Sequence, residues 1–238
     1  MDKKLIIIVS ALVLLLISCG VYHPQMADIH LIDHKGDLRI GVGTSIVPAA
    51  YTTISSGLTD KFALQAFGSV GTNKYYFQIS PGIYKKQQSK HVLELYSGFG
   101  YGHGYENKHP EGPILNPTIY GNYQIYFTQF NWGKNKIESG GLDWGFGIKG
   151  GLIHSNLTDQ NFYNIYSEAG PFPKNKENNI LLEEMFFFRI GFKKVKLSCK
   201  LGLSNAFKLK YQDKPIPTSF INIGIGFDFR PGLKKSKD

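Results

Sequence analysis

The sequence is poor in cysteine and in charge, and it carries none of the common catalytic signatures. Its 238 residues include two cysteines, which excludes a disulfide scaffold and a zinc site built from several cysteines. Charged residues make up 19% of the chain, below the quarter that is usual in globular domains. A P-loop, a dinucleotide glycine motif and a His-Glu-x-x-His motif are all missing. We therefore expect neither an enzyme nor a bound cofactor.

Glycine and aromatic residues are abundant instead. The chain has 27 Gly, 14 Tyr and 17 Phe. Glycine disfavours helices, and this aromatic content is too high for a disordered chain. The length suits one large all-β domain or two small ones. Because the composition does not change along the chain, we expect a single domain.

The first residues have the pattern of a secretory signal. Two lysines precede an apolar run from Leu5 to Ile17. At 13 residues the run is too short for a transmembrane helix, which takes about 20, and it has the length of a signal peptide. The run ends in Leu16-Ile17-Ser18-Cys19, which resembles the lipobox of bacterial lipoproteins.

In proteins with a lipobox, the cysteine thiol is diacylated, the leader is removed before it, and the new amino group is acylated. The resemblance implies a signal peptide over 1–18, a palmitate-type anchor on Cys19 and a linker over 19–35. Three acyl chains would hold the chain to membrane lipid almost permanently, since one chain alone is marginal. No acidic cluster follows Cys19, which favours an anchor that faces the periplasm. The alternative is an ordinary signal peptide with an unrelated cysteine.

From residue 36 onwards, apolar and polar residues alternate with a period of two, which predicts strands. In the strand expected at 117–131, one face carries Ile119, Tyr123, Ile125 and Phe127. We predict an all-β, antiparallel up-and-down β-barrel of outer-membrane type with about ten strands, within a range of about eight to twelve. The barrel occupies 36–230 and a basic tail follows at 231–238. The expected strands are 38–46, 50–58, 61–70, 74–85, 90–105, 117–131, 141–157, 182–193, 195–204 and 219–230.

The polar faces indicate which way the apolar faces point. In the strand at 90–105 the polar face is rich in glycine, which gains nothing on a solvated sheet but fits a narrow, crowded lumen. We therefore expect apolar faces toward lipid and polar faces inward. The strand at 195–204 argues against this, because Lys196 and Lys200 look solvated. The charged residues expected to form a network in the lumen are Arg39, Glu94, Asp143, Lys149, Arg189, Asp228 and Arg230.

The lengths of the connections also favour a membrane barrel. The three longest, 106–116, 158–181 and 205–218, are all odd-numbered connections and so fall at one end. Outer-membrane barrels have short periplasmic turns and long outer loops. If the first strand starts at the periplasmic side, where the anchor leaves it, these loops face outward. The loops at 106–116 and 158–181 are then candidate sites for a surface partner.

Several segments resemble the lipobox-bearing outer-membrane β-barrel proteins of Bacteroidota. They are Lys35-Gly36-Asp37, the stretch from Tyr76 to Tyr84 with the glycine-rich Glu94 to Tyr105, and the hairpin from Phe187 to Ser204. The resemblance implies a fold and a location in the outer membrane, with no reaction attached. The chain departs from many such barrels at its C-terminus, where Phe229 is followed by a lysine-rich tail instead of ending on an aromatic residue.

Candidate chemistry is sparse. His103, Glu106, His109 and Glu111 could offer nitrogen and oxygen ligands to a divalent cation, but a solvated surface loop explains them better, since loops carry His and Glu freely. The pair His154-Ser155 is loosely similar to the His and Ser of outer-membrane lipid deacylases. Adjacent strand residues point to opposite faces, so His154 is badly placed to activate Ser155. Cys199 lies on an apolar face and is expected to pack inertly.

These observations favour a lipid-anchored outer-membrane barrel with a structural or interaction role and a largely plugged lumen. Ten strands enclose little more than side chains. Three alternatives remain: a barrel that binds or transports a small solute, an enzyme that modifies lipid, and a soluble periplasmic barrel held by its lipid anchor. The net charge of +9 comes largely from lysines in turns and in the tail, so we expect no nucleic-acid partner.

Overall fold

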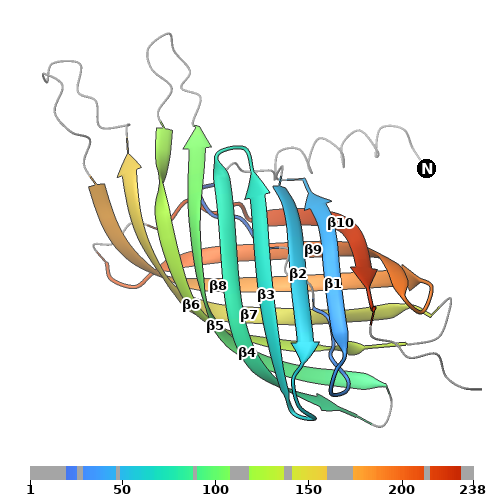
Figure 1. The fold of residues 1–238 in the computed structure, drawn as a ribbon. Helices are drawn as coiled ribbons and strands as arrows, with labels where there is room; N and C mark the ends of the chain where they lie inside the picture. The colour runs from blue at the N-terminus through green and yellow to red at the C-terminus, as the bar shows by residue number, and fades with distance from the viewer. Residues whose placement is uncertain are drawn as a thin grey trace, which may run out of the picture.

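Ten antiparallel strands close into one barrel in the computed structural model (Figure 1). This confirms the predicted all-β class, the antiparallel arrangement and the strand number. Each strand pairs with the next along the chain, and β1 closes the barrel against β10 through pairs such as Ile40 with Phe229. In the described part of the chain, no helix is long and apolar enough to cross a membrane. The structure describes residues 20–25, 29–46, 49–87, 90–107, 118–136, 141–159, 174–211 and 215–231.

The strands differ twofold in length, and the four longest are consecutive. They contain 17 or 18 residues, whereas the strands on the other side of the barrel contain 8 to 10. In order, the strands are β1 (Leu38–Ser45), β2 (Ala49–Gly57), β3 (Phe62–Gly71), β4 (Lys74–Lys86), β5 (His91–Asn107), β6 (Thr118–Lys134), β7 (Asp143–Asp159), β8 (Lys174–Gly191), β9 (Val195–Lys208) and β10 (Ile221–Phe229).

The two ends of the barrel differ in their connections. At what we call the short-turn end, β1 begins, β10 ends, and the connections are 58–61, 87–90, 135–142 and 192–194. At the opposite, long-connection end lie 46–48, 72–73, 108–117, 160–173 and 209–220. The three longest connections share one end, as predicted.

The expected connection at 158–181 is too long, because β8 begins at Lys174. The first six residues of β8 are Lys-Asn-Lys-Glu-Asn-Asn, a polar stretch without the apolar alternation that marked the other strands. Pairing with β7 forms this strand, with His154 opposite Asn178 and Asn156 opposite Lys176. Of the two loops proposed as partner sites, 106–116 and 158–181, residues 108–116 and 160–173 lie outside the described residues, and the rest belongs to β5, β7 and β8.

The half of the barrel nearer the short-turn end carries its apolar side chains outward. Phe188 is 57% exposed and Ile225 is 58% exposed, while Asp143, Arg189 and Asp228 are buried inside. This outer apolar belt is the surface that a membrane barrel presents to lipid. Lys196 and Lys200 also point inward and are buried, so the expectation that this strand is solvated is wrong. Lys196 pairs with Asp143, and Lys200 lies over the ring of Tyr51.

The half of β6 nearer the long-connection end reverses this pattern. In β6, Tyr123, Ile125 and Phe127 point inward and are buried, while Tyr126 and Thr128 are exposed. The expected assignment of this apolar face to lipid is therefore wrong. A 17-residue strand is about 55 Å long at about 3.3 Å per residue, more than a tilted strand needs to cross an apolar band of about 25 Å. These strands extend past the belt (Figure 1, upper left), and their interior there forms an ordinary apolar core.

Two outward positions on β7 test where the lipid-facing belt ends. Replacing Ile148, which is exposed within the belt, by arginine should lower the free energy of unfolding by about 2–4 kcal/mol, the cost of a charge on the lipid face. His154→Arg, six residues along the same face, should change it little, because its neighbours are polar. Denaturant unfolding in lipid vesicles measures both. Equal losses would contradict this assignment of the belt.

Candidate functional site

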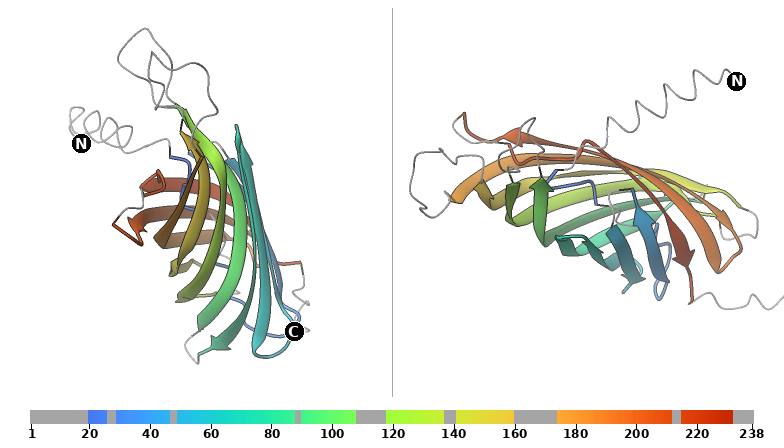
Figure 2. Two further views of the ribbon diagram at one scale, coloured as in Figure 1. Left: turned by 90° about the vertical axis from the view of Figure 1, so that its left-hand side faces the viewer. Right: turned by 90° about the horizontal axis from the view of Figure 1, so that it is seen from above.

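The lumen of the barrel is occupied by the chain's own N-terminal segment. Residues 20–25 and 29–37, which we call the lumen segment, precede β1 and run inside the ring of strands as a blue stretch (Figure 2, right). Tyr22, Ile29, His30 and Leu31 are each 0% exposed. This segment covers most of the stretch at 19–35 that we expected to be a linker. Its apolar side chains explain the difference, because the barrel interior removes them from water.

The first residues of the lumen segment are fixed at the long-connection end. The Gly20 amide donates to the Ser219 hydroxyl at 3.1 Å, and the Lys74 ammonium donates to the Gly20 carbonyl at 2.7 Å. Tyr22 adds backbone hydrogen bonds, donating to the Pro217 carbonyl at 3.0 Å and accepting from the Ser219 amide at 2.8 Å. Gly20 thus lies beside the connection that leads into β10.

The last residues of the lumen segment are fixed at the opposite, short-turn end. The Arg230 guanidinium reaches Asp33 at 2.7 Å and Asp37 at 2.8 Å, and the Gly36 amide donates to the Gly57 carbonyl at 2.8 Å. The segment therefore crosses the barrel lengthwise. We expected Cys19 and the start of β1 on one side. The structure places Gly20, the neighbour of Cys19, at the end opposite to Leu38.

Inward-facing glycines make room for the lumen segment. A Cβ atom at Gly147 would lie 2.8 Å from a side-chain carbon of Ile29, and one at Gly133 would lie 2.9 Å from Leu31. A Cβ at Gly104 would collide with the Val21 carbonyl. Of the glycine-rich face at 90–105 that indicated a crowded lumen, Gly104 faces the segment, whereas Gly100 and Gly102 make room for the rings of Tyr76 and Tyr123.

Around Tyr22 the lumen is closed by aromatic rings and one ion pair. The Tyr22 ring meets that of Tyr123 edge-on with centroids 5.5 Å apart, and Tyr123 stacks on Tyr76 at 6.0 Å. The Tyr22 hydroxyl donates to Glu183 at 2.5 Å, and the same carboxylate pairs with Lys149 at 3.3 Å. Tyr22 thus contacts β6 and β8 directly, and Tyr76 of β4 and Lys149 of β7 contact its two partners.

The charged network sits between the lumen segment and the short-turn end. Arg39 lies 3.4 Å from Asp37 and 3.9 Å from Asp228, which also pairs with Arg189 at 3.4 Å. A second Arg189 nitrogen donates to the Ile29 carbonyl at 2.5 Å. All seven residues expected in the lumen network are buried there: Arg39, Glu94, Asp143, Lys149, Arg189, Asp228 and Arg230.

Three of those residues make their contacts outside the arginine cluster, and one of them is Lys149, which pairs with Glu183. Glu94 accepts a hydrogen bond from the Ile32 amide at 2.7 Å and one from Asn131 at 2.9 Å, so it holds the lumen segment by its backbone. Asp143 pairs with Lys196 at 2.7 Å. The expected network is thus several local pairs, and most of them also contact residues of the segment.

Sequence reasoning missed Asp33, Asp37 and Glu183. Asp33 falls in the stretch expected to be a linker, Asp37 falls just before the first expected strand, and Glu183 falls at the edge of a strand whose start was misplaced. A signal was present, since the seven predicted residues hold four cations and three anions, and buried charges are paired. With Lys196 and Lys200 inward as well, further acidic partners were needed.

Charged side chains gather in the described part of the short-turn end. The hollow between Arg39, Asn135, Lys196 and Arg230 measures about 10 Å³. A single water molecule needs about 10–15 Å³ by the same measure. This hollow therefore has room for no more than one water molecule.

The candidate catalytic and metal residues do not come together. His154 points outward and contacts Asn178 at 2.8 Å, while Ser155 points into the barrel and is buried. His103 faces outward and Glu106 inward, and His109 and Glu111 lie outside the described residues. Cys199 lies on the outer apolar face.

Among the described residues, one cluster has the spacing of a metal site, namely Asp33, His34 and Asp37. Its two carboxylates are already paired with the guanidinium group of Arg230. This cationic partner takes the place that a metal ion would need.

Solved structures with a similar fold are outer-membrane barrels. The outer-membrane protease OmpT from Escherichia coli matches with a TM-score of 0.55 at 8% identity, over 82% of this chain and 96% of that one. The chain has the fold of an outer-membrane β-barrel. The translocator domain of the autotransporter NalP from Neisseria meningitidis matches with a TM-score of 0.44 at 11% identity, over 84% of this chain and 90% of that one. The KdgM porin matches with a TM-score of 0.34 at 8% identity, over 81% of this chain and 98% of that one. No family model and no curated protein matches the sequence.

In this outer-membrane barrel, the ion pairs of Asp33 persist into acid. Burial alone would raise the pKa of Asp33, but Arg230, the hydrogen bond with His34, and Arg39 together lower it below its ordinary value. A carboxyl whose pKa is lower in the folded protein than in the unfolded chain stabilises the fold. This stabilisation is fully present above the pKa of the unfolded chain, which is about 3.9 for Asp. It is lost only as the pH falls through the lower, folded value.

Asp33→Asn tests this electrostatic attachment. The variant should have a smaller free energy of unfolding than the wild type above about pH 5, and the difference should shrink steadily at lower pH, where Asp33 also loses its charge. Denaturant titrations between neutral pH and about pH 3 measure it. As a control, Asp60→Asn in the exposed turn after β2 should show no such pH-dependent difference. A difference that stays constant into acid would contradict the ion-pair explanation.

Proposed function

We propose that this chain is a lipid-anchored protein of the outer membrane whose barrel is closed by its own N-terminal segment and does not conduct. Its role is structural or interactive, exercised from the long-connection end. The observation that carries the proposal is the lumen segment, most of whose described residues are buried in the barrel and which is hydrogen-bonded at both of its ends. The proposed family is that of the lipobox-bearing barrels of Bacteroidota.

The attachment of the lumen segment argues against transport. A plug that opens for solute is held loosely enough to leave, whereas this one buries apolar side chains, two aspartates paired with Arg230, and a backbone amide bound to Glu94. Removing one partner of a buried ion pair costs about 3–5 kcal/mol. Moving the segment would break several such contacts at once.

The anchor is supported by the sequence and by the place where the chain emerges. Leu16-Ile17-Ser18-Cys19 resembles a lipobox, and Gly20 sits at a rim of the barrel beside Ser219. Cys19 is bonded directly to this rim residue. Lipid modification by His154 is not supported by the geometry, since the neighbouring Ser155 lies on the other side of the barrel wall.

Conductance in planar bilayers tests the closed lumen. The pure, folded wild type should give no stepwise currents. A variant that lacks residues 20–32 should give them, because the inner glycines would then face an empty channel. Gly147→Leu is a milder version, since its side chain would collide with Ile29 and displace the segment.

Gly150→Leu is the matched control for Gly147→Leu. It lies three residues along β7, but no atom lies within 4 Å of a Cβ placed there, so the lumen should stay closed. A heat-dependent shift on gels establishes that each variant is folded. Stepwise currents from the wild type would overturn the proposal.

A further inference from the structure

The outer surface of the barrel has an apolar groove near the exit of the lumen segment. It measures about 480 Å³ and lies over β2, β3 and β4 toward the long-connection end. Ala50, Thr52 and Gly68 form a low floor because their outward side chains are small or missing. The larger side chains of Val70, Tyr75 and Phe77 surround this floor. Strand pairing aligns Thr52, Gly68 and Phe77 in one row across the three strands. The next row consists of Ala50, Val70 and Tyr75.

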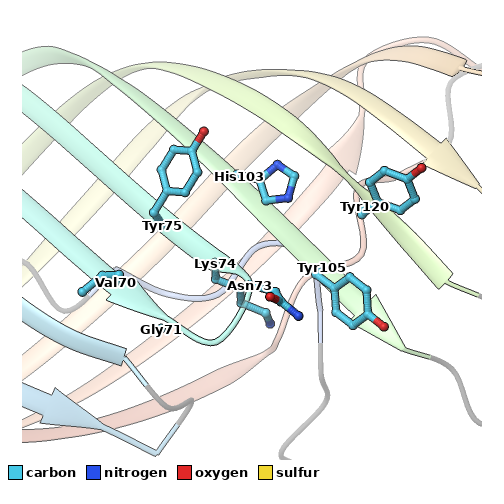
Figure 3. Close-up of a pocket in the computed structure, with 8 residues that line it drawn as sticks. All are labelled: Val70, Gly71, Asn73, Lys74, Tyr75, His103, Tyr105 and Tyr120. Carbon is cyan, nitrogen blue, oxygen red and sulfur yellow. The ribbon is translucent and has the colours of Figure 1, made fainter.

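A more polar hollow of about 660 Å³ adjoins this groove on the side of the rim. The two share Val70 and Tyr75, and the Tyr75 ring stacks on His103 with centroids 5.7 Å apart. In Figure 3, Lys74 and Asn73 stand at the turn between β3 and β4, below Tyr75 and His103. The wall is thus apolar at the groove and becomes aromatic and polar at the rim, as at a membrane interface.

The N-terminal end of the described chain reaches this rim. Lys74, which lines the hollow, donates to the Gly20 carbonyl at 2.7 Å. Cys19 is bonded directly to Gly20. The contacts of Gly20 with Ser219 and Lys74 therefore hold the residue before it close to the hollow and the groove.

We propose that the groove over β2–β4 holds the acyl chains carried by Cys19, so that the lipid anchor packs against its own barrel. The inference rests on the proposed acylation of Cys19. A depression in a lipid-facing wall has to be filled, since an unfilled one forfeits dispersion contacts. Chains tethered next to the groove have a high effective concentration there and outcompete free lipid.

A second groove lies on the other side of Gly20 and suits acyl chains less. It measures about 210 Å³ and is lined by Leu182, Phe207 and Phe220, but also by Glu184. A carboxylate beside an acyl chain would be buried away from water without a partner, which is costly. The groove over β2–β4 is more than twice as large, and none of its lining residues is charged.

This placement also decides the leaflet. The groove lies at the long-connection end, which faces outward in bacterial outer-membrane barrels. The acyl chains of Cys19 would then enter the leaflet at the cell surface. The lack of acidic residues after Cys19 favoured the opposite side, but the crossing of the lumen by residues 20–37 carries the anchor to the other end.

The test uses the full chain in its native outer membrane. Cells are grown with a fatty acid that carries a terminal diazirine, which enters both Cys19 and ordinary lipids. After irradiation and digestion, mass spectrometry should find the acylated N-terminal peptide joined to peptides that contain Gly68 to Phe77. Gly68→Leu should abolish these links by filling the floor. Its nearest contact would be the Tyr76 carbonyl at 3.9 Å, so the side chain fits without strain.

Gly150→Leu, an outward glycine on β7 with equal space, is the control and should leave the links unchanged. Ala50→Leu fills the same floor from β2 and replaces Gly68→Leu if that variant gives no heat-dependent gel shift. An N-terminal peptide without acyl groups would overturn the anchor and the groove together. An acylated peptide whose links go to β8–β9, to free lipid alone, or to β3–β4 regardless of Gly68→Leu would overturn the groove and leave the anchor standing.

Discussion

The buried pairing between the lumen segment and the barrel wall is the interaction on which the rest of the structure depends. A ten-stranded barrel with arginines, lysines and carboxylates inside needs partners for these charges wherever the lumen is filled and water is excluded. Residues 20–37 supply Asp33 and Asp37 to Arg230 and a carbonyl to Arg189. The segment in turn hides its own apolar side chains from water. Neither part would satisfy its buried groups alone.

That filling produces a barrel with two different halves. Near the short turns, charged residues pair in the interior and apolar residues face outward, as in a membrane-spanning wall. Beyond this belt, β5–β8 continue with Tyr123, Ile125 and Phe127 inside. The outer faces there carry His154, Asn156 and Asn178. The outer face of one continuous sheet thus contacts lipid along one part of its length and water along the other.

This division explains what the sequence could reveal and what it could not. The period of two gave the strand number and, in β10, the correct faces, because that strand stays within the belt. In β6 the same period gave the wrong face, since alternation looks identical whether the apolar side meets lipid or an inner core. β8 began earlier than expected, because its first residues are polar on both faces. The lumen segment has no period at all, and only the glycines facing it and the surplus of inward cations pointed to a missing layer.

The path of residues 20–37 has a topological consequence for how the molecule assembles. The segment enters at one mouth and becomes β1 at the other, and β1 forms the seam with β10. Threading the segment through a finished ring would require the N-terminal end to pass through it. The contact of Gly20 with Ser219 joins residues 199 positions apart, and contacts of such high sequence separation form slowly. We therefore expect the seam to close around the segment. The lumen segment would then be the surface around which the sheet closes into a barrel.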